Sequence, residues 1–253
     1  MSGSGELRGR RALVTGAGRR LGRAIALALG RRGMRVALHA HSSRAGAESV
    51  LEEIRAASGD GVVLTADLAD RGQARTLVDS AVDALGGLDL LVASAASFER
   101  VRLDDVDDAA WDRSLELNLG SPFALAHHAL PALRASRGSI VFITCSSATT
   151  PFRGYLPYVV SKGGLRHLMK TLALEVAPDV RVNAVAPGTV LPPDDLDPEA
   201  LARIVRRIPL GRVGSAEDIA EAVVYLASAP FVTGHEIVVD GGRSVAAVET
   251  GGS

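Results

Sequence analysis

Short apolar runs alternate along the chain with longer amphipathic stretches rich in Ala and Leu. The runs predict seven strands, at residues 12–15, 35–39, 62–66, 88–93, 139–144, 180–186 and 236–239. Because they are apolar throughout, they are typical of strands that are buried on both faces of a sheet. Strands that alternate with helices pair in parallel, and the helices cover both faces. The pattern therefore predicts an α/β fold with a doubly wound, seven-stranded parallel sheet.

The amphipathic stretches predict helices at residues 21–32, 45–57, 72–85, 108–135, 156–176 and 216–227. Ser215 is a suitable N-cap for the last of them. The stretch 108–135 predicts either one long helix or a broken pair, because Pro122 and Pro131 are candidate interruptions. Residues 191–199, rich in Pro and Asp, predict an exposed loop or lid, with a plain surface insertion as the alternative. We expect a flexible tail at residues 1–9 and a single domain at 10–253, with the lid at about 190–210.

Composition places the chain among ordinary globular proteins, since 47% of its 253 residues are hydrophobic and 23% are charged. The formal net charge of −1 gives no electrostatic reason to expect nucleic acid or an anionic membrane as a partner. The one cysteine, Cys145, rules out an intrachain disulfide, which is typical of a reducing compartment. With no signal peptide and no transmembrane stretch in the pattern, the expected location is the cytoplasm.

A glycine-rich turn follows the first predicted strand and opens the first helix. Glycines let the backbone approach a pyrophosphate, and a helix N-terminus presents free N–H groups and a partial positive charge. The turn therefore predicts a Rossmann dinucleotide-binding fold, with a tight strand–helix turn that binds nothing as the alternative. The residues expected to contact the dinucleotide here are Gly16, Arg19, Arg20, Leu21 and Gly22.

The end of the second strand indicates which dinucleotide binds. NAD-binding folds place an acidic residue there to accept from the ribose 2′-hydroxyl, and none precedes Glu48. The segment instead offers donors suited to a 2′-phosphate: His41, Ser42, Ser43 and Arg44. This favours NADP(H) over NAD(H), and packing at the strand end is the alternative for His39 and His41. Asp67 and Leu68 follow the third strand, where the carboxylate is placed to accept from the adenine amino group.

Tyr158 and Lys162 are the main candidates for chemistry. They lie four residues apart in the predicted helix at residues 156–176, so both side chains leave the same face. A phenol has a reference pKa of about 10, and a neighbouring ammonium lowers it by stabilising the phenolate. The pair is therefore a proton-donor candidate for a carbonyl or an imine that is being reduced.

The order of these motifs resembles the classical short-chain dehydrogenase/reductase family. The resemblance runs from Arg10 to Arg243 and includes the glycine turn, the fourth strand, Asn118, the Tyr158–Lys162 pair and Pro187-Gly188. In that family the tyrosine is the catalytic acid, the lysine lowers its pKa and binds the nicotinamide ribose, and the asparagine holds a water in a proton relay. The resemblance implies these roles for Tyr158, Lys162 and Asn118. It also implies cofactor contacts from Ser94, Ala95, Ala96, Pro187 and Gly188.

A narrower resemblance is to the pteridine reductases. Residues 15–22 have an arginine where most family members have their middle glycine, and residues 38–43 and 95–98 are similar to those enzymes too. In pteridine reductases the arginine contacts pyrophosphate and pterin, and a phenylalanine stacks on the pterin ring. The resemblance implies these roles for Arg20 and Phe98. The alternative for Phe98 is a core aromatic that follows a strand.

Two stretches depart from the family pattern. Cys145 stands where the family has its catalytic serine and pteridine reductases have an aspartate, and a thiol is a weak donor. Either Cys145 or the adjacent Ser146 is expected to polarise the substrate. Residues 93–96 read Ala-Ser-Ala-Ala in place of Asn-Asn-Ala-Gly, so an asparagine that braces the centre of the sheet is lost.

Together these observations predict an NADPH-dependent reductase that acts on a carbonyl or an imine of a small molecule such as a pterin. Substrate contacts are expected from Arg20, Phe98, Cys145 and Tyr158. The alternatives are a 3-oxoacyl or ketone reductase and a non-catalytic NADP(H)-binding sensor. The family usually pairs through its long helices, which implies a homodimer or homotetramer. No metal site is expected, because His127 and His128 have no carboxylates at metal-binding spacing.

Overall fold

Seven parallel strands form one sheet in the computed structural model, which describes residues 7–192 and 196–249. They are β1 (Arg11–Val14), β2 (Arg35–Ala40), β3 (Asp60–Thr65), β4 (Leu90–Ala93), β5 (Ser139–Ile143), β6 (Arg181–Pro187) and β7 (Glu236–Val239). Their order across the sheet is β3-β2-β1-β4-β5-β6-β7, and every neighbouring pair is parallel. The prediction of a doubly wound, single-domain α/β fold is confirmed.

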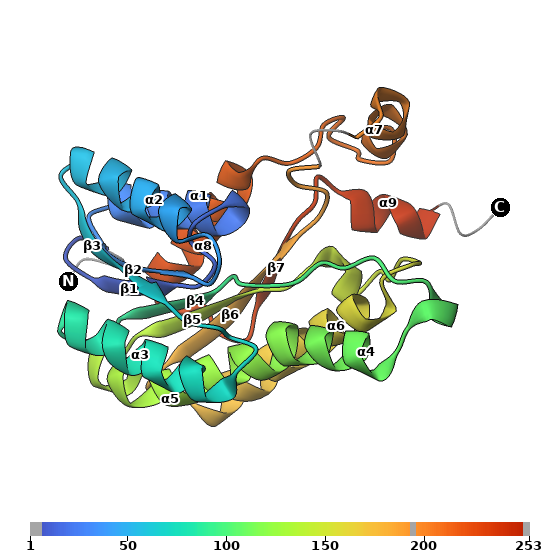
Figure 1. The fold of residues 1–253 in the computed structure, drawn as a ribbon. Coiled ribbons are helices and arrows are strands. Elements are labelled where there is room, and N and C mark those ends of the chain that lie inside the picture. The colour runs from blue at the N-terminus through green and yellow to red at the C-terminus, as the bar shows by residue number, and fades with distance from the viewer. Residues whose placement is uncertain (1–6, 193–195, 250–253) are drawn as a thin grey trace.

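Helices cover both faces of the sheet (Figure 1). One face carries α1 (Arg20–Arg31), α2 (Arg44–Ala56) and α8 (Ala216–Ser228), and the other carries α3 (Arg71–Leu85), α5 (Ser121–Ser136) and α6 (Leu156–Glu175). The strands are buried from both sides: Val36 and Leu38 of β2 pack in one core, and Ala37 between them packs in the other. This explains why the strand sequences are apolar without alternation. No described helix is long and apolar enough to cross a membrane.

The predicted helix at residues 108–135 is a continuous helical segment that contains a π-helical turn. α4 (Asp108–Leu115) runs into the π turn (Glu116–Gly120), which runs into α5. Pro122 lies in the first turn of α5, and Pro131 lies inside α5 without ending it. The irregularity is therefore at Asn118, in the middle of the π turn, and not at either proline. Such turns are frequent at functional sites.

Two short helices were not among the predicted elements. α7 (Pro198–Val205) lies in the stretch expected to be a loop or lid, and α9 (Arg243–Glu249) follows β7. Asp197 caps α7 by accepting from the Ala200 N–H at 2.9 Å, and Pro198 opens it. An acidic N-cap followed by proline is a helix-start signal that could have predicted α7. Residues 193–195 of the expected lid lie outside the described residues.

The expected N-terminal tail is shorter than residues 1–9. Leu7 is buried in the core, and the Gly9 N–H donates to the Gly33 carbonyl at 2.8 Å. The packed domain therefore begins by Leu7 instead of Arg10. Residues 1–6 of the expected tail lie outside the described residues.

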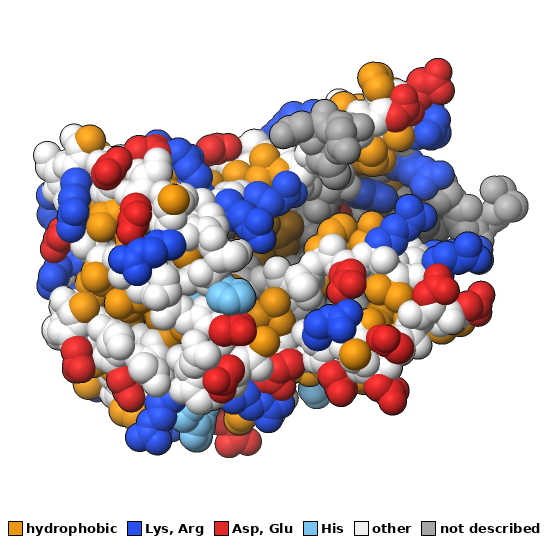
Figure 2. Space-filling model, in the orientation of Figure 1, with side chains coloured by type: hydrophobic (Ala, Val, Ile, Leu, Met, Phe, Trp, Pro, Cys, Tyr) orange, Lys and Arg blue, Asp and Glu red, His pale blue; other side chains and the backbone are white. Residues whose placement is uncertain are grey.

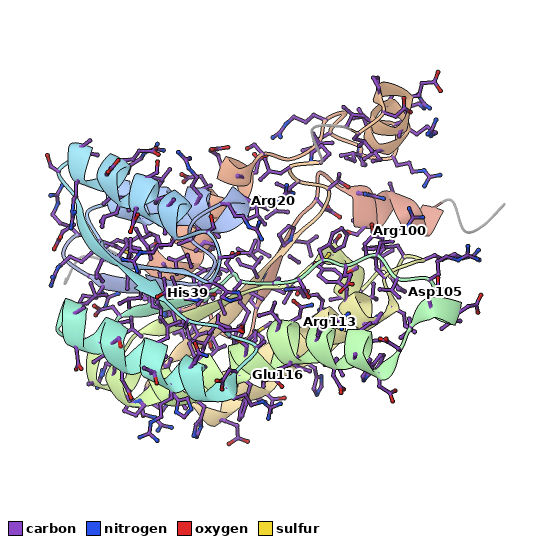
Figure 3. The ribbon with its side chains drawn as sticks, viewed as in Figure 1. Arg20, His39, Arg100, Asp105, Arg113 and Glu116 are labelled. Atoms are coloured by element: carbon purple, nitrogen blue, oxygen red, sulfur yellow. The ribbon has the colours of Figure 1, made fainter. Side chains whose placement is uncertain are left out.

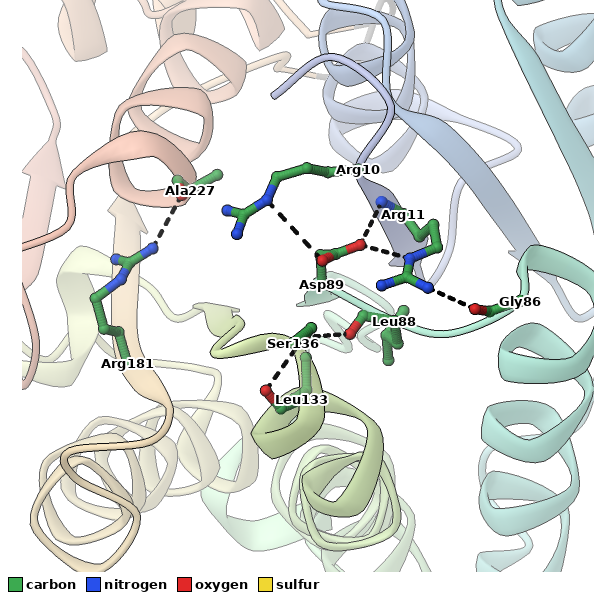
Figure 4. A network of polar contacts seen from close by, with 9 residues as sticks. All are labelled: Arg10, Arg11, Gly86, Leu88, Asp89, Leu133, Ser136, Arg181 and Ala227. Atoms are coloured by element: carbon green, nitrogen blue, oxygen red, sulfur yellow. Dashed lines mark hydrogen bonds and ion pairs between the residues drawn. The ribbon is translucent and has the colours of Figure 1, made fainter. Parts of the chain in front are cut away.

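A polar network joins the amino ends of the central strands (Figure 4). Asp89, just before β4, accepts from the backbone N–H of Arg11 at 2.9 Å and from its Nε at 2.6 Å. The Nε of Arg10 lies 3.9 Å from the other carboxylate oxygen. Ser136 of α5 donates to the Leu88 carbonyl at 2.7 Å. Because the Asp89 side chain is almost fully buried, its charge depends on these donors.

We predict that Asp89→Asn lowers the free energy of unfolding by about 1.5–3 kcal/mol, because it removes the charge that accepts two hydrogen bonds from Arg11. The matched control is Asp60→Asn, which removes an exposed ion pair with Arg35 and should cost less than about 1 kcal/mol. Urea unfolding measures both variants. Equal losses in the two would contradict a stabilising role for the buried network.

Candidate active site

A cavity of about 1530 Å³ lies at the carboxyl edge of the sheet, and Figure 2 shows the hollow. Its walls come from the segments that follow all seven strands, among them residues 187–209 after β6, and from α6. In open α/β sheets, ligands bind where the strand order reverses, which here is between β1 and β4. Cavities for one drug-sized ligand run to about 1,000 Å³, so this one has room for a dinucleotide and a substrate together.

The cavity gathers nearly all of the predicted site residues. The residues expected to bind cofactor all line it: Gly16, Arg19, Arg20, Leu21, Gly22, His41, Ser42, Ser43, Asp67, Leu68, Ser94, Ala95, Ala96, Tyr158, Lys162, Pro187 and Gly188. The expected substrate contacts Phe98 and Cys145, and the alternative donor Ser146, line it as well. Asn118 is the exception, because its side chain is fully buried behind the wall.

Close packing at the glycine turn shows why two of its positions lack a side chain. Gly16 has a φ of +67°, in the left-handed region, and a Cβ there would lie 3.1 Å from the Ala95 Cα. A Cβ on Gly22 would lie 2.1 Å from the Gly16 carbonyl oxygen. The Thr15 hydroxyl accepts from the Ser94 and Ala95 N–H groups, both at 3.0 Å. Thr15 thus joins β1 and β4 beside residues 93–96, where the family asparagine is missing.

Arg20 connects the glycine turn to the segment that leads into α7. It has a φ of +50° and opens α1 beside the cavity (Figure 3). Its guanidinium donates to the Leu191 carbonyl at 2.6 Å, and Leu191 also has a positive φ, +51°. Left-handed backbone is uncommon for either residue type. The predicted contact of Arg20 with pyrophosphate and substrate stays a prediction, because in this structure the guanidinium binds Leu191.

His39 braces three strand ends from inside the protein (Figure 3). It is 1% exposed, its Nδ1 accepts from the Gly16 N–H at 3.3 Å, and its Nε2 lies 3.1 Å from the Ala66 carbonyl oxygen. Since a backbone N–H can only donate, the proton of the neutral ring is on Nε2, which donates to Ala66. Burial lowers the pKa of His39, and the Ala66 carbonyl opposes this shift. Of the two roles considered for His39, the structure therefore supports packing and bracing.

Tyr158, Lys162 and Cys145 meet in the middle of the cavity wall. The first turns of α6 carry Tyr158 and Lys162 on one face, and both side chains are buried. The Lys162 ammonium lies 5.7 Å from the centre of the Tyr158 ring and donates to the Ile143 carbonyl at 2.8 Å. Cys145 comes just after β5, and its Sγ accepts from the Ser147 N–H at 3.4 Å. The helix and the end of β5 therefore place the three groups together.

Burial favours the neutral forms of the tyrosine and the lysine. It raises the pKa of Tyr158 well above its usual value, and hydrogen bonding and charge at Cys145 raise it further. Burial also lowers the pKa of Lys162 to about 8. In the chain alone, burial of the phenol dominates and the net shift of its pKa is upward, so the expected lowering by Lys162 stays a prediction. Of the two candidate polarising groups, Cys145 is the one whose charge and hydrogen bonding affect the pKa of Tyr158.

Asn118 positions a loop instead of reaching the cavity. Its Oδ1 accepts from the Ser97 N–H at 2.9 Å, and its Nδ2 donates to the Ser97 carbonyl at 3.1 Å and to Ser114 Oγ at 3.3 Å. Both polar atoms of the amide are therefore bonded to the protein. The predicted proton relay through a water stays a prediction, and in this structure the Asn118 side chain does not face the cavity to hold that water.

Aromatic rings form the outer part of the wall. The Phe98 ring stacks on Tyr155 with centroids 4.4 Å apart and an interplanar angle of 11°, and it meets Tyr158 edge-on at 4.8 Å. Phe152 meets Tyr155 edge-on at 5.3 Å. Phe98 is 60% exposed, so the alternative of a core aromatic is wrong. The cluster offers a flat apolar surface beside the Tyr158 ring.

The donor set fits a dinucleotide with an extra phosphate. The Lys162 ammonium is fully buried, and the described residues give it one acceptor, so two of its three N–H donors are left for a ligand. The close-packed glycine turn sits at the N-terminus of α1, where backbone N–H groups attract phosphate. Ser42, Ser43 and the exposed His41 provide donors beyond β2.

Comparison with known proteins agrees with the fold. The family model described as enoyl-(acyl carrier protein) reductase matches residues 16–244. The 3β-hydroxysteroid dehydrogenase 1 of Eggerthella lenta is 35% identical over 249 residues, covering 95% of each chain. The 3-oxoacyl-[acyl-carrier-protein] reductase FabG of Staphylococcus aureus is 36% identical over 237 residues, covering 91% of this chain and 96% of that one.

A solved structure is similar over the same span. The FolM alternative dihydrofolate reductase 1 of Brucella canis, complexed with NADP, has a TM-score of 0.88 and 34% identity, and the match covers 95% of this chain and 96% of that one. The chain belongs to the classical short-chain dehydrogenase/reductase family of oxidoreductases.

We predict that His39→Gln reduces the loss of stability on acidification. The pKa of His39 is lowered in the fold, so the unfolded chain binds the extra proton first, and stability falls as the pH drops below about 6.5. Glutamine cannot take up that proton. Urea unfolding between pH 7.5 and 5 measures the effect. His167→Gln, at an exposed histidine of α6, is the control; an identical change in both variants would contradict the role of His39.

Proposed function

We propose that the protein is an NADPH-dependent reductase that reduces a carbonyl or an imine of a small, flat substrate. The observation that carries the proposal is the convergence of Tyr158, Cys145 and Lys162 in one cavity with the glycine turn. When bound there, NADPH would supply a hydride to the substrate carbon. Every other contribution comes from groups of the chain itself.

Tyr158 holds the proton that the reduced substrate receives. Its raised pKa keeps the hydroxyl protonated at neutral pH, so the proton is present to be donated, and a lower pKa in the loaded site would make it a stronger donor. Lys162, with a pKa of about 8, is mostly charged at pH 7 and is fixed by the Ile143 carbonyl, so it would hold the nicotinamide ribose. The Cys145 thiol, which lines the same cavity as Tyr158, polarises the acceptor oxygen or nitrogen.

The choice of NADP(H) over NAD(H) rests on the groups after β2. No acidic residue is present there to accept from a ribose 2′-hydroxyl, whereas His41, Ser42 and Ser43 are donors. The FolM structure, which is similar over almost the whole chain, contains NADP. Asp67, whose carboxylate lies 3.9 Å from His41, would accept from the adenine amino group.

A pteridine reductase-like substrate is favoured by the aromatic wall. Phe98, stacked on Tyr155 and exposed to the cavity, offers a face to a flat ring next to Tyr158. The FolM relative is named a dihydrofolate reductase, which acts on a pterin ring. The second candidate is reduction of a 3-oxoacyl group or another ketone, which the names of the FabG and hydroxysteroid dehydrogenase relatives favour.

We expect Tyr158→Phe to lower the turnover of NADPH with any acceptor by at least about 100-fold, because the proton donor is lost. Binding of NADPH, followed by its fluorescence, should stay within about twofold, because the ring still packs in the wall. Dihydrobiopterin and ethyl acetoacetate serve as the two acceptor classes. Tyr225→Phe, at a half-exposed tyrosine of α8, is the control. Full turnover in Tyr158→Phe would contradict the proposed chemistry.

We expect Cys145→Ser to raise kcat by about tenfold, since a hydroxyl is a stronger donor than a thiol and one better hydrogen bond is worth about 1.4 kcal/mol in the transition state. Cys145→Ala should lower kcat below that of the unaltered protein. Ser146→Ala is the control and should change kcat less than twofold. A loss confined to Ser146→Ala would assign the polarising role to Ser146.

A further inference from the structure

The cavity is lined by more positive charge than a dinucleotide requires. Six cationic side chains line it, namely Arg19, Arg20, Lys162, Arg206, Arg207 and Arg243. Among the described residues of the wall, Asp67 is the one carboxylate. The chain as a whole has a formal charge of −1, so this concentration of arginine is local. A cavity lined by one sign of charge attracts ligands of the opposite sign.

Four of the six cations form two pairs that come from different parts of the chain. Arg19 and Arg20 flank the glycine turn, where the pyrophosphate of the dinucleotide belongs. Arg206 and Arg207 line the cavity and follow α7, which lies well apart from α1 in Figure 1. The 2′-phosphate is provided for by the groups after β2, so the arginines after α7 have no phosphate of the dinucleotide to bind.

Arg206 and Arg207 are free to bind a ligand as far as the described residues show. Neither forms an ion pair with a described carboxylate. Arg203, one turn earlier, lies 4.0 Å from Asp197 and 3.8 Å from Glu199 and is not part of the wall. The wall beside the two arginines is apolar, with Leu196, Ile204 and Pro209. A substrate bound there would cover the guanidinium groups and remove water from them. An anionic group on the substrate would offset that cost through charge-assisted hydrogen bonds.

We propose that the substrate carries an anionic group, a carboxylate or a phosphate, that binds Arg206 and Arg207 while its reducible group faces Tyr158. The inference rests on the proposed reductase function and adds the charge of the substrate to it. Arginine binds both kinds of oxyanion in a two-pronged geometry. The aromatic wall of Phe98 and Tyr155 would cover the flat part between the two ends.

The test compares three aromatic ketones of one shape: 4-acetylbenzoate, its methyl ester and 4-acetylphenyl phosphate. The unaltered protein should reduce at least one of the two anions with a kcat/KM tenfold or more above that of the ester. The Arg206→Gln/Arg207→Gln double variant should lose that preference because its KM for the anion rises. Its kcat/KM for the ester and its affinity for NADPH should stay within twofold of those of the unaltered protein. Arg203→Gln is the matched control and should keep the preference. If kcat/KM in the double variant falls more for 4-acetylbenzoate, the site binds carboxylates. If it falls more for 4-acetylphenyl phosphate, the site binds phosphates.

Calorimetric titration of each ketone into the protein separates this inference from the proposed function. If no ketone is reduced but the double variant loses tenfold or more of its affinity for an anion, the anion site stands and the reductase proposal fails. If anions and ester bind and react alike, or if the double variant changes neither, the anion site is overturned. A loss of NADPH affinity in the double variant, with unchanged anion binding, would also overturn it by assigning both arginines to the cofactor.

Discussion

The parallel direction of all seven strands is the constraint on which the site depends. Every carboxyl end then lies at one edge of the sheet, and the reversal of strand order between β1 and β4 opens a crevice there. The hydrogen bonds from the Ser94 and Ala95 N–H groups to the Thr15 hydroxyl join the two strands at that point. The opposite edge is closed by the buried carboxylate of Asp89. The amino edge of the sheet therefore provides stability, and the carboxyl edge stays open for ligands.

Burial, more than charge, governs the reactive groups at the open edge. It raises the pKa of Tyr158 and lowers that of Lys162, so each side chain is driven toward its neutral form. The lysine keeps its proton near neutral pH because its pKa stays at about 8. A ligand that brings oxygen acceptors to the two spare N–H donors favours the charged ammonium. The ammonium and the ligand thus stabilise each other, which makes the chemistry of the tyrosine dependent on a filled site.

The fold was predictable because strands buried on both faces leave continuous apolar runs, as in β2, and because Ser215 caps α8 with a local signal. The glycine turn and the Tyr158–Lys162 pair were predictable because turn and helix spacing are local too. Contacts between distant segments left no such signal. The bonds of Asn118 to Ser97 and of His39 to Gly16 each join a helical or strand residue to a loop far away in the sequence. The pKa of Tyr158 was missed because it depends on burial, which spacing does not reveal.

The bond between Arg20 and the Leu191 carbonyl has a consequence for exchanging parts between relatives. It connects the start of α1 to the segment that leads into α7, two regions far apart in the chain. A chimera that takes residues 190–209 from another family member keeps this bond only if its backbone also turns left-handed at position 191. Segments chosen for a positive φ at position 191, instead of for overall similarity, are expected to keep the pocket geometry of the relative that supplies them.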